Sequence, residues 1–97
     1  MSANDQTARE LVREVKILNQ YGIHARPAAL FAKTAARFDA DVFVEKGGNR
    51  VSGKSIMGLM TLEASHGTLL RVVAIGPDAE ELLDEIEALI VRKFDEE

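Results

Sequence analysis

Two segments of the chain alternate between hydrophobic and polar residues, and a third is almost wholly apolar. The alternating segments are residues 10–18 and 41–45, and the apolar segment is residues 69–75. Successive side chains of a strand point to opposite faces of a sheet, so these patterns predict three strands with a buried face. Residues 47–49 (Gly-Gly-Asn) are a typical hairpin turn, which predicts a short antiparallel fourth strand at residues 50–52.

Three further segments have the features of helices. Residues 27–38 are rich in alanine, with hydrophobic residues at helical spacing, and residues 55–62 predict a shorter helix with Ser55 as its N-cap. The last helix is expected to begin at Asp78, which forms a variant of the capping box with Glu81. Its buried stripe is predicted to consist of five residues: Leu82, Leu83, Ile86, Leu89 and Ile90.

The resulting order, β-α-β-β-α-β-α, predicts an α+β domain over residues 10–97. We expect a four-stranded antiparallel sheet with three helices packed on one face. The chain has 97 residues, of which 46% are hydrophobic, and this supports one compact core. Residues 1–9 are mostly polar, and we expect them to form a flexible N-terminal leader.

The last predicted strand has apolar residues on both of its faces. If its even-numbered residues face the helices, then Leu69, Val73 and Ile75 face outward, joined by Phe43 from the second strand. Two interpretations are open at this point. These residues are either scattered surface apolar side chains, which are common, or a face covered by self-association or by the leader.

Composition and charge exclude several classes of protein. The chain has no cysteine, which excludes a disulfide framework or a thiolate site. No apolar run approaches the length of a membrane span and residues 1–9 do not resemble a signal peptide, so we expect a cytoplasmic protein without membrane insertion. The net charge of −4, without a basic–aromatic pattern, argues against nucleic acid as a partner. Residues 24–56 nevertheless hold six Lys/Arg against three acids, a basic region suited to acidic partner surfaces.

The most informative residue is His24, in the sequence Gly-Ile-His-Ala-Arg-Pro-Ala. Gly22 supplies a turn and Pro27 suits a first helical turn, so His24 is expected at or next to the N-cap of a helix. The positive end of the helix disfavours imidazolium, which predicts a neutral, nucleophilic ring. An anion on that ring would meet the N–H groups of Ala25 and Arg26 and the guanidinium of Arg26. The spacing alone also fits an ordinary capping or surface histidine.

A second motif, Gly-Lys-Ser-Ile-Met-Gly-Leu-Met at residues 53–60, favours the phosphoryl-carrying interpretation of His24 over an ordinary capping histidine. Together, the two motifs at this separation in so short a chain closely resemble HPr, the histidine-containing phosphocarrier of the bacterial phosphoenolpyruvate-dependent phosphotransferase system. The resemblance covers the chain from about residue 10 to about residue 94. It implies an open-faced β-sandwich with strand order 1-4-2-3, and a carrier in a relay rather than a stand-alone catalyst. No cofactor is implied.

The resemblance also implies roles for individual residues and partners. His24 would accept a phosphoryl group on Nδ1 from Enzyme I and donate it to Enzyme IIA domains, with Arg26 steadying the phosphate. Ser55, besides capping its helix, matches the family's regulatory serine, the substrate of HPr kinase/phosphorylase. Six residues would form a patch for partner docking: Ala25, Ala29, Lys33, Ile56, Met57 and Met60.

Other interpretations remain open from the sequence. The protein would feed sugar uptake, or it would be a nitrogen-branch or purely regulatory paralogue. An α+β module that binds a small ligand without covalent chemistry is a third interpretation. His66 lies in a turn beside Gly67 without acids at ligand spacing, and we expect neither a chemical role for it nor a metal site.

Overall fold

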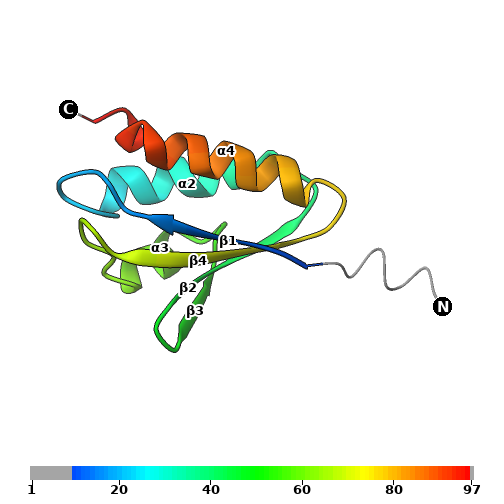
Figure 1. The fold of residues 1–97 in the computed structure, drawn as a ribbon, viewed down its shortest axis with the longest axis horizontal. Helices are drawn as coiled ribbons and strands as arrows, with labels where there is room; N and C mark the ends of the chain where they lie inside the picture. Colours follow the sequence, from blue (N-terminus) through cyan, green and yellow to red (C-terminus); the bar gives the residue numbers. More distant parts are fainter. Residues whose placement is uncertain (1–9, 97) are drawn as a thin grey trace.

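A computed structural model describes residues 10–96 as one antiparallel sheet with helices on one face (Figure 1). The strands are β1 (Glu10–Lys16), β2 (Asp41–Lys46), β3 (Asn49–Ser52) and β4 (Leu69–Ile75). The helices are α2 (Ala25–Ala36), α3 (Ile56–Thr61) and α4 (Ala79–Val91), followed by the 3-10 turn η1 (Lys93–Asp95). The strand order is β1-β4-β2-β3, so the predicted order of elements and sheet topology are confirmed. The expected leader, residues 1–9, lies outside the described residues.

The core lies between the sheet and the helices. The even-numbered side chains of β4 are buried there beside those of β2, and the predicted stripe of α4 is buried throughout. Phe31 of α2 is fully buried among them. Burial of these apolar side chains supplies the main driving force for folding. No helix within residues 10–96 has the length and hydropathy needed to cross a membrane.

Helix α2 begins and ends two residues earlier than the alanine-rich pattern predicts. Its N-cap is His24, which puts Pro27 at the third position of the first turn. Amide groups of the first turn have no acceptor within the helix, so proline costs no hydrogen bond there. At the other end, the N–H of Phe38 donates to the carbonyl of Ala35 at 3.2 Å, in a tighter turn that closes the helix.

The predicted capping box of the last helix is wrong. Asp78 is the N-cap of α4, but its carboxylate accepts no hydrogen bond from the helix it precedes. Its Oδ2 instead accepts from the N–H of Asp39 at 2.7 Å, and the N–H of Asp78 donates to the carbonyl of Asp39 at 3.1 Å. The backbone of Asp78 is not extended (φ −100°, ψ 18°), and its carboxylate therefore serves the turn after α2.

The outer face of the sheet, away from the helices, carries the apolar residues expected there. Leu69 is 61% exposed, whereas Val73 is 1% exposed and pairs in register with Val12 of β1 and Phe43 of β2. The guanidinium of Arg50 lies over the Phe43 ring, 4.3 Å from its centroid. Coverage of this face by self-association or by the leader stays a prediction.

One prediction concerns the loop before α2, where Gly22 has a left-handed φ of 71° and packs against the chain near Ala64. A Cβ at Gly22 would overlap the Ala64 carbonyl oxygen and lie 2.8 Å from Cα of Ser65. We expect Gly22→Ala to lower the free energy of unfolding, measured in urea, by about 2–4 kcal/mol, from the left-handed conformation and the steric overlap together.

Gly47→Ala is the matched control. Gly47 has a similar φ of 60°, but a Cβ there would meet nothing within 4 Å. Gly47→Ala should therefore lower the free energy of unfolding only through the left-handed conformation, by about 1–2 kcal/mol. Equal losses for the two variants would show that the close approach at Gly22 does not matter.

Candidate functional site

His24 is held at the start of α2 by a short, pinned loop. The N–H of Ile23 donates to the carbonyl of Ala64 at 2.8 Å, and the carbonyl of His24 accepts the first helical bond from Ala28 at 2.9 Å. His24 has an extended backbone (φ −95°, ψ −165°), as an N-cap residue requires. Its side chain is 45% exposed. The predicted N-cap position is confirmed, and the ring is open to an approaching partner.

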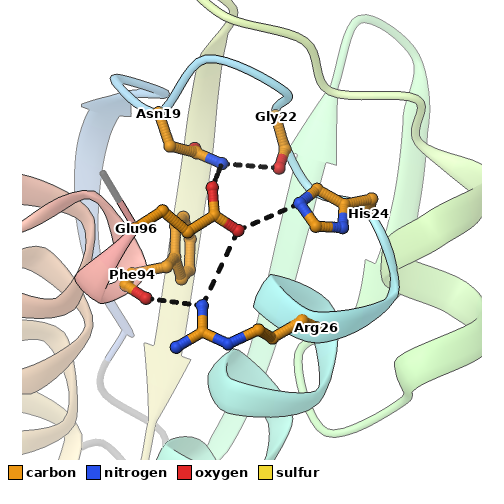
Figure 2. A network of polar contacts seen from close by, with 6 residues as sticks. All are labelled: Asn19, Gly22, His24, Arg26, Phe94 and Glu96. Atoms are coloured by element: carbon orange, nitrogen blue, oxygen red, sulfur yellow. Dashed lines mark hydrogen bonds and ion pairs between the residues drawn. The ribbon is translucent and has the colours of Figure 1, made fainter.

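Arg26 lies beside the histidine but does not contact its ring. One guanidinium nitrogen, Nη1, donates to the carbonyl of Phe94 at 2.8 Å and lies 3.6 Å from Oε2 of Glu96 (Figure 2). The arginine side chain is 52% exposed. In this structure Arg26 thus binds the C-terminal segment, a partner that the sequence analysis did not anticipate.

Glu96 completes a network around His24 (Figure 2). Its Oε2 lies 3.0 Å from Nε2 of His24, and its Oε1 accepts a hydrogen bond from Nδ2 of Asn19 at 2.9 Å. The same Asn19 nitrogen donates to the carbonyl of Gly22 at 2.8 Å. Asn19 is itself buried, with 1% of its surface exposed. The Asn19 amide group therefore connects the side-chain carboxylate of Glu96 to the loop that carries the histidine.

A left-handed turn brings Glu96 to this position. Lys93, Phe94 and Asp95 have φ values of 58°, 54° and 60°, a conformation that costs about 1–2 kcal/mol for each L-residue. Phe94 is fully buried, and burying a phenylalanine side chain contributes about 1.5–3 kcal/mol. The carbonyl of Arg92 also accepts a hydrogen bond from Asp95. The anchored phenylalanine thus directs Glu96 toward His24.

The ring faces an open depression of about 640 Å³. The depression is lined by six residues: Gln20, Tyr21, His24, Arg26, Asp95 and Glu96. The Tyr21 ring stands edge-on to the imidazole with 6.4 Å between centroids. Within residues 10–96, no hydrogen bond reaches Nδ1 of His24, while Nε2 is engaged by Glu96. The ring nitrogen without a hydrogen bond, Nδ1, is therefore the one that the family resemblance implies as the phosphoryl carrier.

Ser55 is the N-cap of α3, as predicted. Its Oγ accepts a hydrogen bond from the N–H of Gly58 at 2.9 Å, and its backbone is extended. The carbonyl of Ser55 accepts the next bond, from Leu59. This capping is worth about 1 kcal/mol to a short helix.

Helix α3 presents an apolar surface beside α2. Leu59 is fully buried, but Ile56, Met57 and Met60 are 43%, 74% and 38% exposed, as the two-turn length of this helix predicts. Ala25 and Lys33 of α2 are also exposed, and Ala29 is half-buried. Partner docking on these residues stays a prediction, and we call the six of them the docking patch: Ala25, Ala29, Lys33, Ile56, Met57 and Met60. Exposed methionine adapts readily to differently shaped partners.

The open-faced α+β fold and the half-exposed histidine at the start of α2 are the features that the resemblance to phosphocarrier proteins implies. The family model for the phosphorylation site of the HPr component of the phosphotransferase system matches residues 11–92. The chain therefore belongs to the HPr phosphocarrier family.

Individual relatives agree with this assignment. The phosphocarrier protein HPr of Treponema pallidum is 45% identical over 87 residues, which cover 90% of this chain and 99% of the relative. The HPr-like protein Crh of Bacillus subtilis is 46% identical over 78 residues, covering 80% of this chain and 92% of the relative. The crystal structure of HPr-C-His from Thermoanaerobacter tengcongensis superposes with a TM-score of 0.83 at 44% identity, covering 92% and 98% of the two chains.

Proposed function

We propose that His24 is the residue that receives and donates the phosphoryl group, through its Nδ1 atom. The observation that carries this proposal is the position of a half-exposed histidine at the N-cap of a 12-residue helix, with no hydrogen bond to Nδ1 within the described residues. The first-turn N–H groups, those of Ala25 and Arg26 among them, favour an anion at this end. A protein donor can therefore present its phosphoryl group to the ring without any part of this fold having to open.

The transfer needs little from the protein beyond positioning. The Nδ1 lone pair attacks phosphorus in line, and the electron pair of the breaking P–N bond stays on the donor's ring nitrogen. Arg26 would stabilise the transferred group by exchanging its bond to the Phe94 carbonyl for one to a phosphate oxygen, which as an anion is the stronger acceptor. The same steps in reverse deliver the group to an acceptor histidine.

The relay we propose runs from Enzyme I through this protein to Enzyme IIA domains in the cytoplasm. The docking patch combines residues of α2, the helix that His24 caps, with exposed apolar residues of the neighbouring α3, and Lys33 of α2 gives it a positive charge. A small apolar surface that carries a positive charge suits acidic partners that must bind and dissociate quickly.

We propose Ser55 as a second, regulatory phosphorylation site for an HPr kinase/phosphorylase. A phosphate on its oxygen would lie beside the exposed Ile56 and Met57, within the docking patch. The negative charge of a phosphate there would repel an acidic partner, and removing water from that charge on docking would cost free energy. Phosphorylation of Ser55 would therefore slow transfer to His24.

A purely regulatory role is the second candidate, favoured by the 46% identity to an HPr-like protein named Crh and by the presence of Ser55. A nitrogen-branch role would use the same chemistry with another acceptor. The domain that accepts the phosphoryl group distinguishes these roles. Transfer from the phosphorylated protein to a sugar-specific IIA domain supports sugar uptake. Transfer to a nitrogen-branch IIA domain alone supports the nitrogen-branch role.

The first prediction from the proposed function tests whether His24 is the residue that accepts the phosphoryl group. Incubated with Enzyme I, Mg²⁺ and phosphoenolpyruvate, the protein should gain an acid-labile phosphoryl group, and His24→Ala should gain none. His66→Ala is the matched control, because His66 is the chain's other histidine and is exposed in the turn before β4. It should be phosphorylated like the parent. An adduct on His24→Ala would exclude His24, and no adduct on the parent would favour non-covalent ligand binding.

The second prediction tests Ser55. HPr kinase and ATP should give an acid-stable phosphate on the parent and none on Ser55→Ala. Ser52→Ala is the control. Ser52 also accepts a backbone hydrogen bond, from the N–H of Lys54, and is exposed, but it lies at the end of β3 and does not cap a helix. The modified parent should receive phosphate from Enzyme I more slowly, about ten-fold or more, because an interfacial like charge costs several kcal/mol. Unchanged transfer would argue against the regulatory role.

The third prediction tests the docking patch. Met57→Ala should raise KM for phosphorylated Enzyme I about five-fold or more with little change in kcat, since Met57 would be a central contact. Val91→Ala is the control, because Val91 is 62% exposed but belongs to α4. If both variants have the parent's KM, partners dock elsewhere.

A further inference from the structure

The contact between Glu96 and His24 gives the C-terminal segment a role at the histidine. Oε2 of Glu96 is 3.0 Å from Nε2, a hydrogen-bond distance, and a carboxylate can only accept a hydrogen bond. The proton of a neutral His24 ring is therefore favoured on Nε2, which leaves a lone pair on Nδ1. We propose that Glu96 is a positioning residue that selects this tautomer and orients the ring. This inference rests on the proposed function of His24.

The carboxylate is itself held in place, as positioning requires. Glu96 is 18% exposed and has contacts from two other side chains: Asn19 donates to Oε1 at 2.9 Å, and Nη1 of Arg26 lies 3.6 Å from Oε2. Asn19 is buried and bonded to the loop carbonyl of Gly22, so the anchor is part of the fold (Figure 2). Groups fixed before the reaction save the cost of ordering them during it.

The arrangement follows the logic of a carboxylate–histidine pair in hydrolases, with the two ring nitrogens exchanged. When Nδ1 of His24 forms its bond to phosphorus and Nε2 keeps its proton, the ring becomes cationic. The carboxylate of Glu96 stabilises this charge. A phosphohistidine donor that starts with a protonated ring leaves with a neutral one, so phosphorus moves from nitrogen to nitrogen and charge balances without a proton crossing the interface.

Glu96 does not obstruct the reactive nitrogen. It contacts Nε2, whereas the incoming phosphoryl group would bond Nδ1, on a different edge of the ring. The ring thus separates the two anions. Arg26 lies beside the carboxylate and offsets part of its charge.

The test compares Glu96→Ala with Asp95→Asn in the full chain. Asp95 is exposed in the same turn and pairs with Arg92, so Asp95→Asn removes one negative charge nearby without touching the ring, and asparagine tolerates a left-handed φ. Two readouts are needed: the tautomer, from ¹⁵N chemical shifts of the labelled His24 ring, and the single-turnover rate of phosphorylation. The rate is measured with phosphorylated Enzyme I and with phosphoramidate, whose P–N bond breaks to release ammonia.

We expect the parent and Asp95→Asn to hold the ring proton on Nε2, and Glu96→Ala to show a smaller excess of that tautomer. Both rates should fall about ten-fold in Glu96→Ala alone, as for loss of one hydrogen bond to a charged group. The amide spectrum of the core should stay unchanged, which separates this loss from misfolding.

Several results would overturn the positioning role. These are an unchanged tautomer and rates in Glu96→Ala, equal losses in Asp95→Asn, a loss with Enzyme I but not with phosphoramidate, and a faster rate, which would make Glu96 an obstruction. Failure of the parent to accept phosphate from either donor would instead defeat the proposed function itself.

Discussion

The site depends on one close approach of two stretches of backbone. Gly22 packs against the chain at Ala64 and Ser65 with no space for a side chain, and the N–H of Ile23 donates to the Ala64 carbonyl beside it. This contact joins the loop before α2 to the segment that leads into β4. Because the loop is packed and hydrogen-bonded against this segment, the position of the N-cap that follows is defined. His24 is therefore presented by a rigid support although its side chain is half exposed.

The C-terminal turn is a second constraint, and it opposes local preference. Three consecutive L-residues adopt a left-handed conformation after α4, and the full burial of Phe94 together with the hydrogen bonds to this turn offsets its cost. The same turn presents the Phe94 carbonyl to Arg26 and the carboxylate of Glu96 to His24. The conformational cost of this turn is thus accompanied by contacts that order the side chains of His24 and Arg26.

Exposure in this fold follows from the lengths of its helices. Helices α2 and α4 are long enough to bury a continuous stripe, whereas α3 has six residues and buries only one of them fully, Leu59. Its remaining apolar side chains lie at the surface beside α2. Such a surface suits the relay proposed above, because each proposed partner would have to bind briefly and a rigid, enclosed pocket would release it slowly.

Local pattern determined much of this protein. Alternation and the Gly-Gly-Asn turn predicted the strands, and Gly22 with Pro27 predicted the N-cap position of His24, because each of these depends on neighbouring residues alone. Tertiary structure decided the rest. Asp78 had the local pattern of a capping box, yet its carboxylate bonds a residue from another turn. Glu96 lies 72 positions from His24, and no periodicity or motif marks it, since its place depends on how Phe94 packs in the finished core.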